Sequence, residues 1–255
     1  MDGHCWLHRG AFACGQELAQ GVSTKKYINF FLKMIGILRQ NGITQILVVF
    51  NGIPLPNKIE TNKSRSDLRK KNLHLARAAE AAEDTKTAQT YYQRSVSITS
   101  DMIQNLMAAL TEHKVHYMVA PYEADAQLAF LSRMDIVDLV ISEDSDTIVY
   151  GCKSVLFKLD KEGNGDLIKR SDLGTNEALS FAHWTDDLFK LFCCLAGCDY
   201  MPGIRNVGIK GAYKITAKCN TLTKVIEHLI ASNATLDYDG FLITRLERTF
   251  DCTIH

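Results

Sequence analysis

Three short apolar segments, separated by helical patterns, constrain the fold of this chain more than any other feature. The segments have the length and the β-branched composition of buried strands: 45–50 (QILVVF), 116–120 (HYMVA) and 138–142 (DLVIS). Apolar residues recur at helical spacing in three further segments, over 27–38, 98–110 and 122–134. Strands that alternate with helices through short links form parallel sheets. We therefore predict an α/β fold with a central, mostly parallel sheet flanked by helices.

The second half of the chain shows a different pattern. Residues 154–169 are predicted to form a hairpin with its turn at DKEGNGD, and the chain beyond 185 is predicted to be mostly helical. Thr185 suits the N-cap of the first of these helices and Gly197 suits its C-cap.

Composition excludes several classes of protein. The 255 residues include 29 Lys and Arg against 29 Asp and Glu, and 46% are hydrophobic, which is typical of one large globular domain or two small ones. No run of roughly 18 apolar residues predicts a membrane span, and the first residues, MDGHCWLHRG, lack the pattern of a secretory signal. Eight cysteines without a CxxC pair indicate reduced thiols rather than a zinc site or a disulfide framework.

Although the net charge of the chain is zero, two segments carry net charges of opposite sign. Residues 58–77 carry seven basic and two acidic side chains, a net charge of +5, whereas residues 122–146 carry seven acids and one base, a net charge of −6. Residues 66–92 have high helix propensity but little amphipathic character, so they form a solvated helix or one that orders on a partner.

Acidic residues follow the predicted strands at the ends where sites form in open α/β sheets. The candidate ligands are Glu123 and Asp125, Asp144 and Asp146, Asp199, and Asp2 near the start. Gathered carboxylates repel one another unless cations compensate them, and carboxylate oxygens suit Mg²⁺ or Mn²⁺. A pair of such ions suits phosphodiester hydrolysis. The alternative is that these residues are helix caps and solvated turn residues.

A glycine-rich segment, 201–216 (MPGIRNVGIKGAYKIT), precedes and enters another predicted helix. Gly203 and Gly208 would expose backbone N–H groups to a phosphate, and Lys210 and Lys214 begin a basic stripe along the helix. The segment lacks the GK[ST] of a nucleotide-binding P-loop, which disfavours an ATPase. It fits a sequence-independent grip on a DNA backbone, and a purely structural helix–turn–helix is the alternative.

Five motifs in order resemble the nuclease core of the flap-endonuclease superfamily: DGHCWLHRGA, VFNG, APYEADAQLA, ISEDSDTIVYG and LAGCDYMPGIRNVGIKGA. The KSVLFKLDKEGNG hairpin and the path from GIPLPNK into the basic helix look most like its exonuclease 1 branch. The resemblance implies a PIN-like 5′-nuclease core with a helical arch and a helix–two-turns–helix DNA-binding element. It implies a magnesium-dependent 5′ to 3′ exodeoxyribonuclease and 5′-flap endonuclease, active in the nucleus in DNA repair, mismatch repair and recombination.

The resemblance also assigns roles to individual residues. The residues that match metal ligands for two Mg²⁺ ions, which Mn²⁺ can replace, are Asp2, Glu123, Asp125, Asp144, Asp146 and Asp199. Lys58 and Arg65 match the catalytic basic pair at the base of the arch. The residues expected to contact DNA are His8, Lys58, Arg65, Arg69, Gly203, Gly208, Lys210 and Lys214. A monovalent cation such as K⁺ is expected at 201–216. The expected partner is double-stranded DNA with 5′ ends, nicks or flaps, with no membrane, and the protein is expected to be a monomer.

The family pattern divides the chain into four parts: the N-terminal part of the core (1–57), the arch (58–95), the internal part with the metal site (96–199), and the final part with the helix–two-turns–helix (200–255). Two departures stand out. Met1 directly precedes Asp2 where the family has a first strand, so we expect a truncated or wrongly assigned start. Asn51 stands where the family has an Asp metal ligand. These departures favour the alternative of a catalytically weak or inactive protein that binds DNA junctions.

Overall fold

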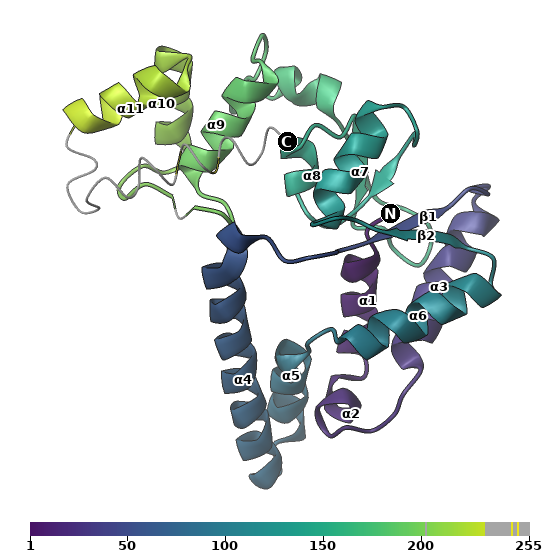
Figure 1. Ribbon diagram of the computed structural model, residues 1–255. Helices are drawn as coiled ribbons and strands as arrows, with labels where there is room; N and C mark the ends of the chain where they lie inside the picture. The colour runs from purple at the N-terminus through teal and green to yellow at the C-terminus, as the bar shows by residue number, and fades with distance from the viewer. Residues whose placement is uncertain (202, 233–245, 247–248, 250–255) are drawn as a thin grey trace.

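The computed structural model describes residues 1–201, 203–232, 246 and 249, and it combines many helices with short strands (Figure 1). The α-helices are α1 (Gly3–Phe12), α2 (Gly15–Ala19), α3 (Lys26–Gln40), α4 (Ile59–Ala81), α5 (Thr85–Ser95), α6 (Ser100–Glu112), α7 (Ala124–Arg133), α8 (Asp146–Val149), α9 (Asp186–Ala196), α10 (Ile209–Cys219) and α11 (Leu222–Ala231). The strands are β1 (Leu47–Phe50), β2 (His116–Val119), β3 (Val140–Ile141), β4 (Ser154–Phe157) and β5 (Asp166–Lys169). Two 3₁₀ helices, η1 (Pro56–Lys58) and η2 (Arg170–Thr175), complete the described elements.

The strands form two small sheets rather than the one central sheet that we predicted. β1 and β2 pair in parallel, and β3 and β4 also pair in parallel. The predicted hairpin over 154–169 is confirmed, because β4 and β5 pair in an antiparallel manner. The predicted parallel pairing is therefore correct. The structure differs from the prediction because β1 and β2 form one sheet, and β3, β4 and β5 form another that is separated from it by a gap.

The first two residues bridge this gap. The Met1 ammonium donates a hydrogen bond to the Leu47 carbonyl at 2.7 Å, and the Val49 N–H donates to the Met1 carbonyl at 2.9 Å. On the other side, the Asp2 N–H donates to the Ile141 carbonyl at 2.9 Å. Met1 and Asp2 thus lie between β1 and β3, which brings the acids that follow β3 close to Asp2.

The two faces of β1 pack against different helices because successive side chains of a strand point to opposite faces. Val48 and Phe50 belong to a core built with α1, α3 and α6, whose Trp6, Phe31 and Leu106 are fully buried. Val49 instead packs in a second core with α7 residues such as Ala124 and Leu128. Helices therefore cover both faces, as the continuous apolar character of the strand predicted.

The basic segment forms a hairpin of two helices, α4 and α5, that extends away from the sheets (Figure 1). The segment predicted as one helix is interrupted after Ala82, because Glu83 adopts a positive φ of 59° and Asp84 caps α5 by accepting from the Thr87 N–H at 3.1 Å. The hairpin has a small core of Ala76, Ala88 and Tyr92. The rest of α4 is largely exposed, as its low amphipathic character indicated.

The C-terminal helices form a further unit on α9. The Thr185 hydroxyl accepts from the Leu188 N–H at 3.2 Å and Gly197 has a φ of 105°, so both predicted caps of α9 are confirmed. Trp184 stacks on Tyr213 with ring centroids 5.0 Å apart, which anchors α10 beside α9. Much of the predicted final part, 200–255, lies outside the described residues. Within the part that is described, no helix has the length and apolar character needed to cross a membrane.

Candidate active site

The predicted carboxylates come from four places in the sequence and lie beside the two sheets. Asp2 precedes α1 and caps it, because its Oδ1 accepts from the N–H groups of His4 at 2.8 Å and Cys5 at 3.3 Å. The other five follow strand or helix ends, as predicted: Glu123 and Asp125 at the start of α7, Asp144 and Asp146 after β3, and Asp199 after α9. Asp144 Oδ1 accepts from the Asp146 N–H at 2.9 Å, so one turn fixes both of these acids.

Asp125 and Asp146 occupy the inner part of this group. Among the described residues, the Asp125 Oδ1 atom is buried and has no hydrogen-bond partner. Burial, followed by the charges of Asp2, Asp144 and Asp146, raises the pKa of Asp125 to about 9. Burial and the Asp144 charge raise the pKa of Asp146 to about 6. The protein has thus placed carboxylates where their negative charge is not compensated.

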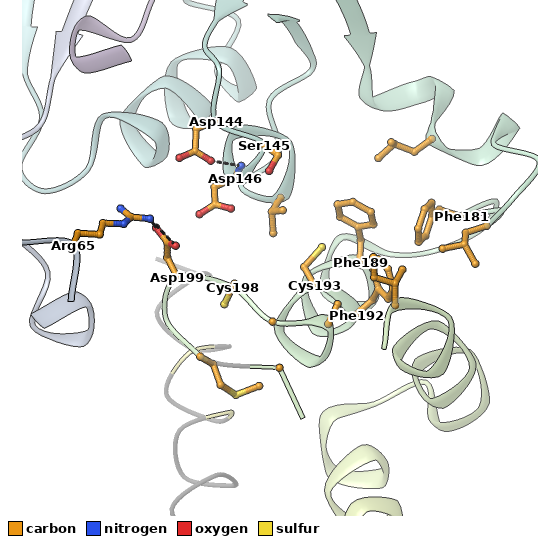
Figure 2. A pocket seen from close by; sticks show the side chains of 18 residues that line it. Arg65, Asp144, Ser145, Asp146, Phe181, Phe189, Phe192, Cys193, Cys198 and Asp199 are labelled. Carbon is orange, nitrogen blue, oxygen red and sulfur yellow. Dashed lines mark hydrogen bonds and ion pairs between the residues drawn. The ribbon is translucent and has the colours of Figure 1, made fainter. Parts of the chain in front are cut away.

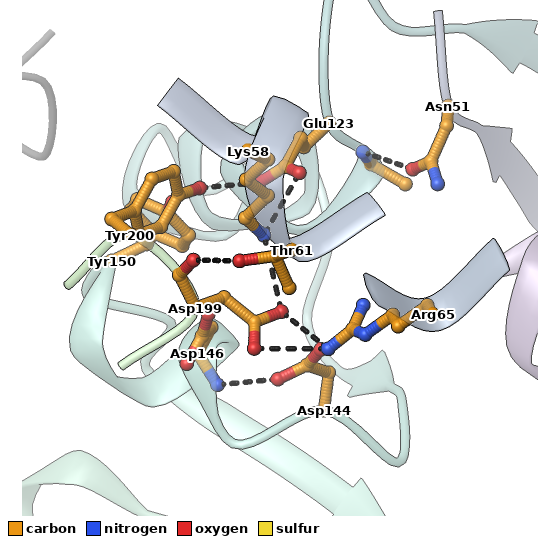
Figure 3. Close-up of polar contacts among 11 residues, drawn as sticks. Asn51, Lys58, Thr61, Arg65, Glu123, Asp144, Asp146, Tyr150, Asp199 and Tyr200 are labelled. Atoms are coloured by element: carbon orange, nitrogen blue, oxygen red, sulfur yellow. Dashed lines mark hydrogen bonds and ion pairs between the residues drawn. The ribbon is translucent and has the colours of Figure 1, made fainter. Parts of the chain in front are cut away.

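Glu123 and Asp199 occupy the outer part and are paired with cations from the base of α4 (Figure 3). The Lys58 Nζ atom lies 2.9 Å from Glu123 Oε1 and 3.7 Å from Asp199 Oδ2, and the Lys58 side chain is only 9% exposed. Burial alone would lower the Lys58 pKa, but the hydrogen bond to Glu123 and the charges of Asp199 and Asp146 raise it overall. Lys58 therefore remains charged inside the site.

Arg65 binds the same outer acid. Its Nη2 donates to Asp199 Oδ1 at 2.9 Å and to Oδ2 at 2.7 Å. Thr61, one helical turn before Arg65, donates its hydroxyl proton to the Asp199 carbonyl at 2.8 Å. The predicted basic pair thus lies against the predicted ligands, and Thr61 is a contact that the sequence did not suggest.

Two tyrosines at the site were also missed by sequence reasoning. The Tyr200 hydroxyl donates to Glu123, and the hydroxyls of Tyr150 and Tyr200 contact each other (Figure 3). Burial is the largest cause that raises the pKa values of both phenols, so both remain protonated. The only sequence signal for Tyr200 was its position next to the candidate ligand Asp199. Nothing in the sequence indicates that Tyr150 lies beside Tyr200.

A cleft of about 880 Å³ opens beside the carboxylates (Figure 2). Arg65, Asp144, Asp146 and Asp199 line one end of it, and an apolar wall that includes Phe181, Phe189 and Phe192 lines the other. The site is therefore accessible to a ligand larger than an ion.

Asn51 follows β1 and contacts the start of α7. Its Oδ1 accepts from the Ala124 N–H at 2.8 Å, and its own N–H donates to His4 Nδ1 at 3.2 Å. Asn51 thus provides α7 with a side-chain cap from another part of the chain, next to Glu123 and Asp125. The prediction that Asn51 ligates a metal remains a prediction.

The donor set fits hard divalent cations, because it consists of carboxylate oxygens and includes the unpartnered Asp125 Oδ1. The acids have not converged, however: no group of three or more His, Cys, Asp or Glu side chains in the described part of the chain is arranged to hold a metal ion. Lys58 lies between Glu123 and Asp199, which accounts for part of this separation.

The remaining predicted DNA contacts lie outside the carboxylate group. His8 is half-buried on α1 and its ring packs on Phe12 with centroids 5.0 Å apart. Burial, and then the charge of Arg69 on α4, lowers the His8 pKa, so His8 and Arg69 lie near enough to interact.

The glycine-rich segment has one open glycine and one packed glycine. Gly208 caps α10, and a Cβ atom added there would meet nothing within 4 Å, so its backbone is accessible. A Cβ atom at Gly203 would lie 2.9 Å from the Ala196 carbonyl oxygen, which gives Gly203 a packing role. Lys210 and Lys214 are exposed on α10 as predicted. Pro202, within the predicted segment, lies outside the described residues.

Comparison with known proteins agrees with the motifs. The family model of the XPG N-terminal domain matches residues 1–72 of the sequence, and the family model of the XPG I-region matches residues 114–199. Exonuclease 1 of Xenopus laevis is 39% identical over 98% of this chain and 35% of its own length. Exonuclease 1 of Arabidopsis thaliana is 38% identical over 90% of this chain and 31% of its own length. The chain thus spans about a third of the length of these relatives.

Solved structures show the same fold. The catalytic core of Rad2, solved in complex with DNA substrate, matches with a TM-score of 0.64 at 17% identity over 100% of this chain and 71% of that chain. Flap endonuclease-1 from Methanococcus jannaschii matches with a TM-score of 0.58 at 24% identity over 91% of this chain and 69% of that chain. The predicted PIN-like α/β core is therefore confirmed. Since motifs, family models and relatives agree, the chain belongs to the flap-endonuclease superfamily, in its exonuclease 1 branch.

Proposed function

We infer that this chain is the nuclease core of a metal-dependent 5′ nuclease that hydrolyses phosphodiester bonds of DNA. The observation that carries this inference is the buried, unpartnered Asp125 Oδ1 atom amid further carboxylates. A protein gains nothing in stability from such a group unless a cation binds it. Lys58 and Arg65, at the base of α4, carry the positive charge that a DNA phosphate can bind.

Six acids would hold the metal ions: Asp2, Glu123, Asp125, Asp144, Asp146 and Asp199. Two Mg²⁺ ions, or Mn²⁺ in their place, are the natural occupants of such oxygen ligands. When bound, the ions would activate the attacking water and stabilise the leaving oxygen. Asn51 would add at most a neutral carbonyl oxygen beside them, and its link to Ala124 steadies the segment that carries Glu123 and Asp125.

Lys58 and Arg65 would act on the reacting phosphate. Each now neutralises an acid at the edge of the site, at 2.9 Å from Glu123 and 2.7 Å from Asp199 respectively. A phosphate group that enters the cleft offers both cations equivalent oxygen acceptors. They can then stabilise the charge that develops in the transition state, since both are already oriented toward the centre.

The rest of the molecule would hold the DNA. The open backbone at Gly208, with Lys210 and Lys214 on α10, suits a phosphate backbone, and a K⁺ ion at 201–216 would support this contact. His8 and Arg69 would contact the DNA near the arch. None of these groups offers a pattern for reading bases, so binding should not depend on sequence.

The relatives support the proposed substrate class. Proteins named exonuclease 1, and a yeast protein named DNA damage-inducible protein DIN7 that is 35% identical to this chain, support a role in DNA repair. We propose a 5′ to 3′ exodeoxyribonuclease and 5′-flap endonuclease acting on duplex ends, nicks and flaps in the nucleus during mismatch repair and recombination. A monomer would be sufficient for this chemistry, since every proposed site residue comes from one chain.

Asn51 favours a second candidate, a protein that binds 5′-ended junctions but cuts them slowly or not at all. A neutral ligand in place of a carboxylate weakens the first metal site without removing the DNA contacts.

A cleavage assay on 5′-recessed and 5′-flap duplexes with Mg²⁺ tests both candidates. The nuclease predicts labelled 5′ products that disappear when a chelator removes the metal. Tight, metal-independent binding of the same duplexes without product would support the second candidate instead.

Gly208→Val tests the proposed DNA grip. A side chain at this open position should hold the phosphate away from the backbone, which we expect to weaken binding roughly tenfold for duplexes of any sequence. Gly36→Ala in α3 is the matched control, because a Cβ atom there also meets nothing within 4 Å. A loss that depends on DNA sequence would point to base readout and contradict the proposal.

A further inference from the structure

Two tyrosines lie beside the carboxylate centre and have no part in the function proposed above. Tyr150 directly follows α8 and Tyr200 follows Asp199, so the fold brings together residues 50 positions apart. Tyr200 is only 4% exposed and Tyr150 is half-buried. Their hydroxyls contact each other beside Lys58 and Glu123 (Figure 3).

The direction of these hydrogen bonds follows from proton counting. The Glu123 carboxylate can only accept, so Tyr200 donates its single hydroxyl proton to Glu123 Oε2. The Tyr200 oxygen then has only acceptor capacity left, and Tyr150 must be the donor in the contact between the two hydroxyls. The result is a directed chain from Tyr150 through Tyr200 to Glu123.

Tyr200 also contacts Lys58 through its ring. The Lys58 Nζ atom lies 4.4 Å from the centroid of the Tyr200 ring, a distance at which the ring face attracts an ammonium group. The same ammonium binds Glu123 Oε1 at 2.9 Å. Tyr200 and Lys58 thus each bind a different oxygen of the Glu123 carboxylate. Tyr200 contacts both of the others, Glu123 through its hydroxyl and Lys58 through its ring.

We propose that Tyr200 is a positioning residue that fixes the Glu123 carboxylate with its hydroxyl and seats the Lys58 ammonium on its ring, while Tyr150 directs the Tyr200 proton toward Glu123. The consequences for metal binding and cleavage rest on the proposed function. A carboxylate held in one orientation presents its oxygens to an incoming metal ion without first having to be ordered. An ammonium that rests on a ring stays near the centre when a metal ion takes over Glu123.

A purely structural role makes a different prediction. If the two rings only filled the space beneath the site, removing a hydroxyl would lower stability and leave metal affinity and Lys58 accessibility unchanged. Phenylalanine variants separate the roles, because they keep the rings and remove the hydroxyls.

The experiment compares Tyr200→Phe, Tyr150→Phe, the double variant and Tyr200→Leu. Mn²⁺ affinity is measured by the electron paramagnetic resonance of the free ion, in the absence of DNA. We expect Tyr200→Phe to lower Mn²⁺ affinity and the single-turnover cleavage rate roughly tenfold, with duplex affinity unchanged. Tyr150→Phe should lower both about threefold, and the double variant should be no worse than Tyr200→Phe, because Tyr150 acts through Tyr200.

A second readout follows Lys58 itself. Acylation by an N-hydroxysuccinimide ester, located by mass spectrometry, should be slow at Lys58 in the native chain because its side chain is 9% exposed. Tyr200→Leu, which removes both hydroxyl and ring, should make Lys58 react several-fold faster, relative to the exposed Lys70 in the same sample.

The matched control is Tyr92→Phe, which removes a hydrogen bond from a buried tyrosine to Glu80 at 2.5 Å, within the hairpin of α4 and α5. It should leave Mn²⁺ affinity unchanged. The proposal would be overturned if the Tyr200 variants had the same Mn²⁺ affinity and Lys58 reactivity as Tyr92→Phe. The part assigned to Tyr150 would be overturned if the effects of the two phenylalanine substitutions were additive. If the native chain cleaved no DNA, the proposed function would fail, while the Mn²⁺ and acylation results would still decide this inference.

Discussion

The inner and outer acids of the carboxylate centre differ in how their charge is compensated. Asp125 and Asp146 are half-buried near other acids, and their pKa values rise to about 9 and about 6. Glu123 and Asp199 instead bind Lys58 and Arg65 directly. Asp125 therefore needs a ligand that no described residue supplies, whereas the outer acids share cations that a phosphate could also use. On the proposed function, one cluster would serve both metal and substrate, and each half can be tested separately.

The largest effect is expected from removing an inner acid. Asp146→Ala, or Asp144→Ala beside it, should reduce cleavage by about 10³-fold or more, because the metal ions lose a ligand that the neighbouring residues cannot replace. DNA binding in metal-free buffer should be largely retained, since on the proposed function these carboxylates bind metal rather than phosphate. A parallel loss of DNA affinity in metal-free buffer would show that the acids are structural and that the two halves are not distinct.

Removing an outer cation should have the next largest effect. Lys58→Ala or Arg65→Ala should lower the single-turnover rate at saturating enzyme by roughly 10²–10³, the effect of losing one donor to a developing charge. Lys70→Ala is the control, because Lys70 pairs with Asp67 at 3.8 Å on the exposed side of α4. If all three variants change only the salt dependence of DNA binding, the outer cations are solvated charges without a role in the reaction.

A smaller effect is expected at Asn51, which binds the Ala124 N–H at the start of α7, next in sequence to Glu123 and Asp125. Asn51→Asp keeps an acceptor for the Ala124 N–H and adds a charge near the inner acids. We expect a several-fold higher cleavage rate and a lower Mg²⁺ midpoint, because an anionic ligand binds the first ion more tightly. Asn51→Ser keeps a capping oxygen without the charge and should produce neither change. Equal Mg²⁺ titrations for native, Asp and Ser proteins would show that position 51 ligates no metal.

The smallest expected effect is on the pH dependence of stability without metal. In the unfolded chain Asp125 ionises near its ordinary pKa of 3.8, whereas in the fold it ionises only near 9. The folded state therefore binds the proton more tightly, and stability falls as the pH rises from about 4 to about 9. In a chelator, Asp125→Asn should raise the melting temperature by a few degrees at pH 8 and by less at pH 5. Parallel melting curves for the two proteins across this range would contradict the assignment of an uncompensated inner acid.

Local features of the fold were predictable because they depend on residues a few positions apart. The apolar runs at 45–50 and 116–120 gave β1 and β2, and the caps at Thr185 and Gly197 gave the ends of α9. The split of the basic segment at Glu83 was not predicted, because no Gly or Pro marks it and the interruption relies on a positive φ together with the Asp84 cap.

The carboxylates could also be predicted, because acids that directly follow parallel strands must lie at one edge of the sheet. Their partners could not. Lys58 is 65 positions from Glu123 and 141 positions from Asp199, yet its ammonium lies between them. The sequence showed a basic block and an acidic block, and only the path of the chain from β1 into α4 determines which cation meets which acid.

By itself, the sequence determined the strands, the helices with a clear apolar period, the parallel pairing and the set of acids, because hydrophobic periodicity, caps and strand-end position act over short distances along the chain. Only the tertiary structure decided that Met1 and Asp2 bridge two sheets, that Asn51 caps α7, and that Tyr200 joins Glu123 to Lys58. It also decided which acids remain uncompensated, because the pKa of a carboxyl depends on its burial and on charges brought near by folding. Those quantities have no local signature in a sequence.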